Sequence, residues 1–424
     1  MIKFLLKGIL DDRSRSLLPI IVVGLGVALT VLLHGWITGA LGDSIEMNAD
    51  FNSGHLKVMS RAYAKDYEQM PNDLALLEAD PLVKKIKNDY PDLDWVRRIR
   101  FGGLIDFPDE KGETRAQGPV VGWAIDLFTP GSTEIERFKL QGAVLNGKLP
   151  SKPGEALITN DFATKFKVKP GDAFTLFGTT MDGGMAFRNF TVAGTVRFGS
   201  SVVDRGAIIA DITDIRKALG MEGAAGEILG YFNAGVYDDK KATFLMNDFN
   251  QKYRVDKDEY APQMIRLRDQ GGMAEYLDIS NAMGAIMVFI FVMAMSVVLW
   301  NAGLLGGLRR YNEFGVRLAL GEKKKHIYST LLYEGLLIGI IGSVAGTVVG
   351  LSVSYYIQIV GLDLGDMMQR STLMMPTVVR TRITPTAFYI GFIPGVFSMV
   401  LGNALAGIAI FKRNTAQLFK ELEV

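Results

Sequence analysis

Four long stretches that contain no Asp, Glu, Lys or Arg constrain this chain more than any other feature of its sequence. A helix needs about 20 apolar residues to cross a bilayer, and each of these stretches is longer than that. Hydrocarbon cannot hydrogen-bond to backbone groups, so only helices and closed barrels span it, and no alternation of period two indicates a barrel. We therefore predict an α-helical bundle of four transmembrane helices. They cover Ser16–Gly42, Ile279–Leu308, Gly335–Leu362 and Ile383–Phe411.

Positive charges flank these stretches on one side of the predicted membrane. They lie before the first span, between the second and third, and after the fourth: Lys3, Lys7, Arg13, Arg15, Arg309, Arg310, Arg317, Lys323, Lys324, Lys325, Lys412, Arg413 and Lys420. Cytoplasmic loops carry an excess of such residues, so both termini are predicted to be cytoplasmic. The first span is too long for the apolar core of a cleaved signal peptide, which favours a retained signal anchor.

The long segment between the first two spans is predicted to lie outside the cytoplasm. Strand-like runs at Trp95–Phe107 and Phe187–Val196 and helical patterns at Asp73–Asp89 and Lys241–Lys252 indicate an α+β domain with two subdomains. We expect residues 1–42 to form the N-terminus and span 1, and residues 43–278 to form the outer domain, with a β-rich insertion at about 140–232. Span 2 (279–308) is followed by a cytoplasmic loop (309–326), and span 3 (327–362) by an outer loop (363–382). Span 4 (383–411) leads into a cytoplasmic tail (412–424).

Composition excludes several kinds of chemistry. The chain has 46 basic and 45 acidic residues, which is not the basic footprint of a nucleic-acid-binding protein. It has no cysteine, and its three histidines lie far apart, so we expect no disulfide and no metal site. Gly142–Leu149 resembles a phosphate-binding loop, but Leu149 cannot offer the required hydroxyl to magnesium. We find no catalytic motif and predict that the chain is not an enzyme.

The loop between spans 2 and 3 carries the most informative pattern. Phe314 and Leu318 fall on one helical face at i and i+4, and Glu313 and Arg317 form a second pair with the same spacing. A short amphipathic helix along the inner membrane surface would suit a contact with a motor protein. A positively charged loop that merely sets the topology explains the residues equally well.

This loop resembles a motif of the FtsX-like, or MacB-type, permeases of ABC transporters. The family pattern is similar to R-x-x-E-x-G-x-x-R-A-x-G, followed by an isoleucine and a glutamate before a glycine-rich span. The chain matches it at Arg310, Glu313, Gly315, Arg317, Gly321, Ile327, Glu334, Gly342 and Gly346. It departs at Leu318-Ala319, where many members have Arg-Ala. The run Gly154–Asp172 also resembles the family's periplasmic domain, and the layout is closest to that of the lipoprotein-release permeases LolC and LolE.

The resemblance implies a complex in the bacterial inner membrane. A pair of permeases, two copies or two paralogues, would bind a cytoplasmic dimer of ABC ATPases, and the large domain would be periplasmic. ATP and magnesium would bind in the ATPase, so this chain would need no cofactor. Span 2 would extend as a stalk and carry ATP-driven closure to the outer domain by mechanotransmission. The ATPase-coupling residues would be Arg310, Glu313, Phe314, Gly315, Arg317 and Gly321.

Two further sets of residues indicate helix packing and a substrate surface. Gly342, Gly346 and Gly350 are four apart, a spacing that lets membrane helices approach closely, either within this chain or at a dimer seam. Met283 and Met287 share one face of span 2. Methionine adapts to varied apolar ligands, so they are candidates for a groove that holds acyl chains, although core filling or lipid contact is the more common role.

Three functions fit these expectations. The first is ATP-driven extraction of a lipoprotein from the outer leaflet, handed to a periplasmic carrier. The second is export of small hydrophobic drugs or peptides. The third is a signalling permease that transports nothing and controls a cell-wall hydrolase or a sensor kinase. The sequence does not separate them.

Overall fold

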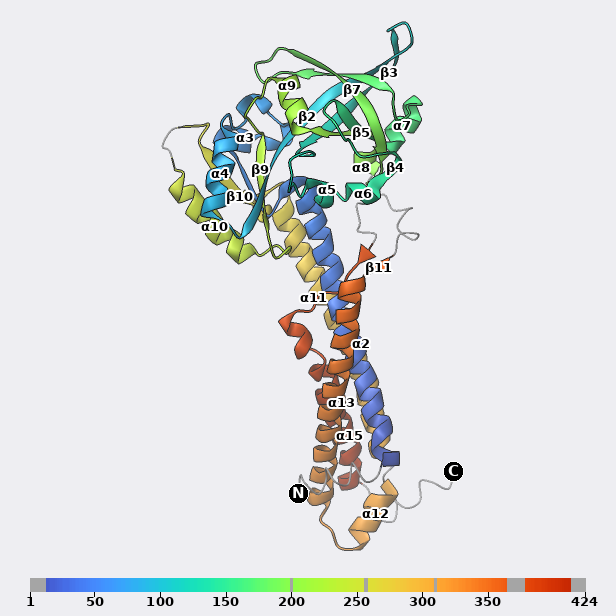
Figure 1. The fold of residues 1–424 in the computed structure, drawn as a ribbon. Helices are drawn as coiled ribbons and strands as arrows, with labels where there is room; N and C mark the ends of the chain where they lie inside the picture. Colours follow the sequence, from blue (N-terminus) through green and yellow to red (C-terminus); the bar gives the residue numbers. More distant parts are fainter. Residues whose placement is uncertain (1–12, 199–200, 255–257, 309–310, 364–377, 413–424) are drawn as a thin grey trace. The chain divides into compact units, whose positions relative to one another are not determined.

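A computed structural model describes residues 13–198, 201–254, 258–308, 311–363 and 378–412 of the chain (Figure 1). The chain divides into two compact units. The helical unit contains Met1–Asp43, Ile279–Leu364 and Val378–Val424. The α/β unit contains Ser44–Asp278 and Gly365–Thr377. Two long helices, α2 (Arg13–Asn48) and α11 (Met273–Leu308), contribute residues to both.

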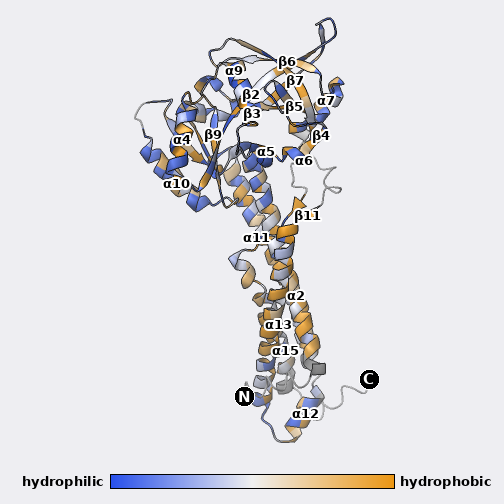
Figure 2. Cartoon of the chain, in the orientation of Figure 1, coloured by the Kyte–Doolittle hydropathy of each residue, from blue (hydrophilic) through white to orange (hydrophobic). Residues whose placement is uncertain are grey.

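The helical unit contains the apolar segments predicted from the sequence. Four segments of the described residues are long and apolar enough to cross a membrane, and they appear as the most hydrophobic helices in Figure 2. They are Leu17–Ser53, Met273–Leu308, Lys324–Val360 and Pro385–Ile408. The predicted fold class, four membrane helices plus a mixed α and β domain, is confirmed.

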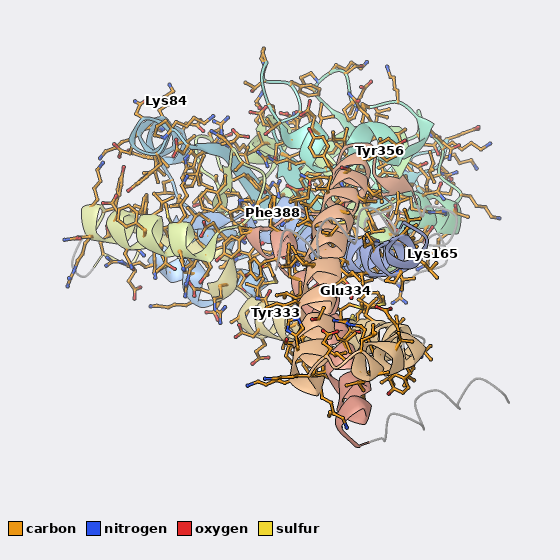
Figure 3. All side chains as sticks on the ribbon, turned by 90° about the horizontal axis from the view of Figure 1, so that it is seen from below. Lys84, Lys165, Tyr333, Glu334, Tyr356 and Phe388 are labelled. Carbon is orange, nitrogen blue, oxygen red and sulfur yellow. The ribbon has the colours of Figure 1, made fainter. Side chains whose placement is uncertain are left out.

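Small residues bring α2 and α13 (Lys324–Val360) into close contact. A Cβ atom added to Gly346 would collide with the carbonyl oxygen of Gly24, and one added to Gly350 would lie 2.9 Å from the carbonyl oxygen of Ala28. Gly342 meets Val23 in the same way. The three glycines of the sequence motif therefore lie against α2 of the same chain. Figure 3 views the helices from below and places Tyr333 and Glu334 in the first half of α13 and Tyr356 near its other end.

The fourth span differs from the continuous helix expected over 383–411. Its outer half consists of a 3₁₀ turn (Pro385–Phe388) and a π-helical turn (Ile393–Phe397), and the regular helix α15 begins only at Ser398. Proline supplies no backbone N–H, which interrupts the α-helical ladder. The residues that lead into this span are held by neighbouring helices, since the Arg382 N–H donates to Gly35 O at 2.9 Å and the Ile383 N–H to the Gln358 side chain at 3.4 Å.

The α/β unit is built on one ten-stranded sheet. Nine strands follow the order β10-β1-β9-β2-β3-β8-β5-β7-β4, and β6 pairs with β2 and β7. The strands are β1 (Leu56–Ser60), β2 (Leu93–Pro108), β3 (Thr114–Ile125), β4 (Val144–Gly147), β5 (Glu155–Thr159), β6 (Ala173–Thr179), β7 (Met185–Val196), β8 (Ala207–Asp211), β9 (Glu227–Phe232) and β10 (Pro262–Arg266). The helices are α3 (Arg61–Lys65), α4 (Ala79–Asp89), α5 (Glu134–Arg137), α6 (Leu140–Ala143), α7 (Asn160–Phe166), α8 (Ser201–Asp204), α9 (Ile212–Leu219) and α10 (Asp239–Lys252).

Strand β2 joins the two halves of this sheet. Its first half pairs with β9 from Leu93 to Arg98, and its second half pairs with β3 and β6. The predicted insertion of 140–232 is therefore wrong at its end, because β9 belongs to the first half of the sheet, next to β1. The helix predicted at Asp73–Asp89 begins only at Ala79, after a 3₁₀ turn at Asn72–Leu74.

The two faces of strands β1, β9 and β2 are buried in different ways. One face is apolar, with Val58, Ile228 and Trp95 packed under α4 and α10. On the opposite face, the strand register places Arg98 beside Glu227, and Lys57 beside Leu229, two residues further along β9. Lys57, Arg98 and Glu227 are all buried there. A buried charge is tolerated only when it is paired, so this face must be held by ion pairs.

The close approach of α2 and α13 makes a testable prediction. Gly346→Ala should lower the unfolding free energy of the detergent-solubilised chain by about 1–3 kcal/mol, the usual cost of overpacking. Gly306→Ala is the matched control, because a Cβ atom there meets nothing within 4 Å. Equal unfolding midpoints for the two variants would show that the glycine contact does not hold the helices together.

Candidate coupling helix and helix junction

The short helix α12 (Tyr311–Ala319) follows α11 and is anchored on the helices that come after it. Phe314 is 1% exposed and packs with Ile327 and Leu331 of α13. The Tyr311 hydroxyl donates a hydrogen bond to the carbonyl oxygen of Ala406 in α15 at 2.9 Å. One side of α12 is thus fixed to the base of two membrane helices.

A glycine cap ends this helix. Gly321 has a φ of +92°, a left-handed conformation that glycine adopts without strain. Its N–H donates to Leu318 O at 3.0 Å, and the N–H of Glu322 donates to Arg317 O at 3.1 Å, which is the hydrogen-bond pair of a Schellman motif. The cap turns the chain sharply from α12 toward α13.

The Arg317 side chain reinforces the same turn. Its Nε and Nη2 atoms each lie 2.6 Å from one carboxylate oxygen of Glu322. These hydrogen bonds lower the pKa of Glu322. The sequence pattern paired Arg317 with Glu313, whereas the structure gives its guanidinium a two-bond ion pair with Glu322. Arg317 therefore holds the end of the helix rather than standing free for a partner.

The other side of α12 presents apolar side chains outward. Leu320, just beyond its last turn, is 82% exposed, and Val316, four residues earlier, is also exposed. The helix thus has two apolar i, i+4 pairs, of which Phe314 and Leu318 face α13 while Val316 and Leu320 do not. Phe314, one of the predicted ATPase-coupling residues, is buried within the chain, and its part in coupling stays a prediction.

The remaining predicted coupling residues are placed as follows. Gly315 is buried and Glu313 is half-buried on α12. Arg310 lies outside the described residues. Val316 and Leu320 were missed because spacing alone does not say which of two apolar pairs packs inward. Val316 and Leu320 have the same i, i+4 spacing as Phe314 and Leu318, but the larger Phe314 drew the prediction to the other pair.

A second candidate site lies where α2 ends inside the α/β unit. The helix passes into a π-helical turn at Ala49–Ser53 before β1 begins. Arg98 of β2 donates from Nη1 to the carbonyl oxygens of Asp50 at 2.7 Å and Phe51 at 3.1 Å. Its Nε and Nη2 atoms pair with both carboxylate oxygens of Glu134 on α5, at 2.7 and 2.9 Å.

This Arg98–Glu134 pair is shielded from water. The two side chains are 1% and 0% exposed, and the guanidinium lies 4.6 Å from the Phe138 ring centroid. Two carbonyls of the π-turn, one carboxylate and one ring surround a single guanidinium. The planar fork of arginine suits such a site, which lysine could not fill.

A histidine fixes the same turn from the other side. His55 lies at the start of β1, and its Nδ1 atom accepts a hydrogen bond from the Phe232 N–H at 3.0 Å. The ring proton therefore sits on Nε2, which contacts the Glu46 carboxylate of α2 at 2.6 Å. The second oxygen of Glu46 accepts from the Tyr237 N–H at 2.7 Å.

The start of α11 joins this junction. Met273 and Leu277 pack with Ala49 and Leu267 in one small apolar cluster. The Gln270 side chain donates to Ser53 O at 3.1 Å. The ends of the two long helices in this unit are therefore held to each other and to the sheet. We call this set of contacts, from Glu46 to Leu277, the helix junction.

The helical unit also contains an apolar pocket of about 330 Å³. Its lining residues come from α2, α11, α13 and the segments that follow α13: Leu29, Leu32, Leu33, Trp36, Phe291, Ile357, Leu362 and Thr381. Met283 and Met287 do not line this pocket. They are half-exposed on α11, and Phe291 follows them at the same spacing of four on the same helical face.

Two family profiles match the chain. The MacB-like periplasmic core domain matches residues 16–239, which is more than half of the chain. The FtsX-like permease C-terminal domain matches residues 285–415. The chain belongs to the FtsX/MacB-type family of ABC transporter permeases. Members of this family work with cytoplasmic ABC ATPases, and ATP is hydrolysed in that separate subunit.

The sequence identity to individual relatives is low. The permease is 24% identical over 214 residues to the lipoprotein-releasing system transmembrane protein LolC of Haemophilus influenzae, a match that covers 48% of this chain and 50% of that protein. The periplasmic region of MacB from Actinobacillus actinomycetemcomitans matches with a TM-score of 0.35 and 9% identity, over 54% of this chain and 95% of that one. The match to LolC thus spans about half the length of that relative.

The loop that resembled a phosphate-binding motif has another role in the permease. Within Gly142–Leu149, residues 142 and 143 end α6, and Val144–Gly147 form β4, which pairs with β7. Within the parts of the chain that the structure describes, no group of three or more His, Cys, Asp or Glu could hold a metal ion.

The helix junction yields a prediction about stability. Glu134→Gln leaves the Arg98 guanidinium buried without its counter-charge, which should lower the unfolding free energy of the permease by about 3–5 kcal/mol. Glu136→Gln, on the exposed side of the same short helix, should change it by less than about 0.5 kcal/mol. Chemical unfolding followed by tryptophan fluorescence measures both. A Glu134→Gln variant as stable as Glu136→Gln would mean that Arg98 is not held by Glu134.

Proposed function

We propose that this permease is the membrane subunit of a lipoprotein-release transporter, which extracts lipid-anchored proteins from the outer leaflet of the inner membrane. The match with a lipoprotein-releasing LolC over half its length supports this substrate class. In this proposal the permease works as a pair, two copies or two paralogues, on a cytoplasmic ATPase dimer. Both termini are cytoplasmic, and the α/β unit faces the periplasm, where a carrier receives the lipoprotein.

The apolar surface of the helical unit is the observation that carries the proposal. Met283, Met287 and Phe291 form an apolar row on α11, and Phe291 also lines the 330 Å³ pocket. Acyl chains need an apolar, adaptable surface, which methionine and phenylalanine provide. The row begins about three turns after the start of α11, near the end of the helix that adjoins the α/β unit. We propose that acyl chains leave the leaflet along this row.

The mechanical route follows from the two candidate sites. The ATPase docks on the exposed side of α12, where Val316 and Leu320 insert into it, and its closure moves the base of α13. The buried anchors Phe314 and Tyr311 make α12 move with the membrane helices. Helices α2 and α11 carry the displacement to the helix junction, where Arg98 and Glu134 transfer it to the sheet. In this proposal the permease works by mechanotransmission, and substrate does not pass through the chain.

The alternative within transport is export of small hydrophobic drugs or peptides. The match of a MacB-like core domain to residues 16–239 favours it, and the same apolar row would accept such compounds. A signalling permease that controls a cell-wall hydrolase would need the coupling helix and the junction but not the apolar row. Substitutions in the row therefore separate transport from signalling.

The docking face of α12 can be tested directly. Val316→Ser combined with Leu320→Ser should abolish co-purification of the cognate ATPase, because both apolar contacts are lost, while the permease keeps its unfolding midpoint. Lys325→Ser, an exposed change in the first turn of α13, is the control. Phe314→Ala should instead lower the unfolding midpoint, since it empties a packed site. An ATPase that binds the double variant normally would rule out this face.

The substrate can be captured at the apolar row. A photo-crosslinking amino acid at Met287 or Phe291 should attach to a lipidated protein in cells, whereas one at Val348, an exposed apolar position of α13, should attach to lipid alone. Capture of an unlipidated small molecule would favour the exporter. Permease that captures nothing at Met287, yet still stimulates its ATPase, would contradict lipoprotein release and leave signalling.

A further inference from the structure

The predicted outer loop ends with two arginines that the proposed function does not use. Arg380 and Arg382 lie just before the fourth span, although membrane proteins concentrate basic residues in their cytoplasmic loops. Topology therefore does not explain these two positive charges. Their surroundings in the helical unit indicate a ligand instead.

The backbone of residues 380–382 is fixed between two membrane helices. A Cβ atom added to Gly39 of α2 would collide with the carbonyl oxygen of Arg380, so the segment lies directly on that helix. The Thr381 hydroxyl donates a hydrogen bond to Ser354 O of α13. Both arginine side chains therefore start from a fixed backbone, near the end of α2 that continues into the α/β unit.

Each arginine side chain lies over a glycine. A Cβ atom built on Gly42 of α2 would lie 2.6 Å from Arg382 Nη1, and one built on Gly361, just after α13, would lie 3.8 Å from Arg380 Nε. Neither guanidinium forms an ion pair with a carboxylate of the residues that the structure describes. Two positive charges at this end of the helical unit can therefore attract an anion.

The apolar pocket of the helical unit adjoins these arginines. Thr381, which separates them in the chain, lines this pocket of about 330 Å³, and so does Leu362, the neighbour of Gly361. The other lining side chains are aliphatic or aromatic, and Leu29 and Trp36 among them are 51% and 39% exposed, so the pocket opens at the surface of the unit. Tryptophan is enriched at the level of lipid headgroups. The site thus combines an apolar cavity with two cations beside it.

We propose that this site binds one phospholipid of the outer leaflet, with an acyl chain in the pocket and the phosphate held by Arg380 and Arg382. The planar fork of a guanidinium matches a phosphate through two parallel hydrogen bonds. An acyl chain suits a pocket lined almost entirely by hydrocarbon side chains, which a free phosphate ion would leave empty. The two parts of the site together therefore select an amphipathic ligand.

This lipid is distinct from the cargo of the proposed function. The diacylglycerol anchor of a lipoprotein carries no phosphate, so the two arginines recognise a membrane lipid and not the lipoprotein. Phe291 belongs both to the pocket and to the apolar row of α11. A phospholipid in the pocket would therefore occupy the end of that row until cargo displaces it. Only this last consequence rests on the proposed function, and the binding site does not.

The need for a phosphate can be tested on the unmodified full-length permease. Native mass spectrometry of the detergent-solubilised protein should show one bound phosphatidylglycerol. A diacylglycerol with the same acyl chains should bind at least about tenfold more weakly, because it lacks the charge-assisted hydrogen bonds. Excess inorganic phosphate should not displace the lipid, since it gains nothing from the pocket. Equal binding of diacylglycerol, or displacement by inorganic phosphate, would overturn the proposal. The experiment contains no lipoprotein, so its failure leaves the proposed function standing.

Variants assign the binding to this site. Arg380→Gln combined with Arg382→Gln should reduce the affinity for phosphatidylglycerol about tenfold or more, and Leu32→Trp, which fills the pocket, should weaken it as well. The matched control is Arg115→Gln combined with Arg197→Gln, two exposed arginines of the α/β unit whose loss changes the net charge equally. An arginine double variant that binds as much lipid as this control, or a photo-crosslinker at Leu32 that attaches to a second copy of the permease in place of lipid, would contradict the site.

Discussion

The α/β unit depends on one buried guanidinium. Arg98 bonds two carbonyl oxygens of the π-turn that ends α2 and both oxygens of Glu134, so a single side chain joins a membrane helix to the central strand of the sheet. Moving the charges of Arg98 and Glu134 out of water costs several kcal/mol of free energy, and the hydrogen bonds of Arg98 offset this cost. An apolar pair of the same volume could fold as stably, but it could not bond the carbonyls of the turn. The need to hold an irregular turn therefore explains the buried Arg98–Glu134 pair.

The rest of the charged face follows the same logic. Lys57, Glu227 and Arg98 lie on the successive strands β1, β9 and β2, and each is paired within the unit. The opposite face of these strands is an ordinary apolar core. A sheet that is apolar on both faces could slide against the segments packed on it. A face built from directional ion pairs fixes the register between the strands and the end of α2, which suits the force transfer that we propose for this unit.

Much of the fold was predictable from the sequence, because the membrane imposes strong rules. Absence of charge identified the four spans, and alternation identified β2 and β7 within a few residues. The candidate coupling helix α12 was located by its family resemblance and its apolar spacing. The predictions that failed concerned features set by tertiary contacts. The sequence did not indicate which apolar pair of α12 faces inward, nor that β9 crosses back to pair with β1. Arg98 and Glu134 were not singled out in the sequence, because nothing local distinguishes a buried ion pair from an exposed one.

The broken outer half of the fourth span has a consequence for how the chain enters the membrane. The residues that lead into it, Arg382 and Ile383, donate their backbone N–H groups to Gly35 O of α2 and to the Gln358 side chain of α13, because hydrocarbon offers no acceptor. Released alone into lipid, this segment would carry unpaired polar groups at a cost of several kcal/mol. We therefore expect the first and third spans, which supply these acceptors, to be in place before the fourth is released into lipid.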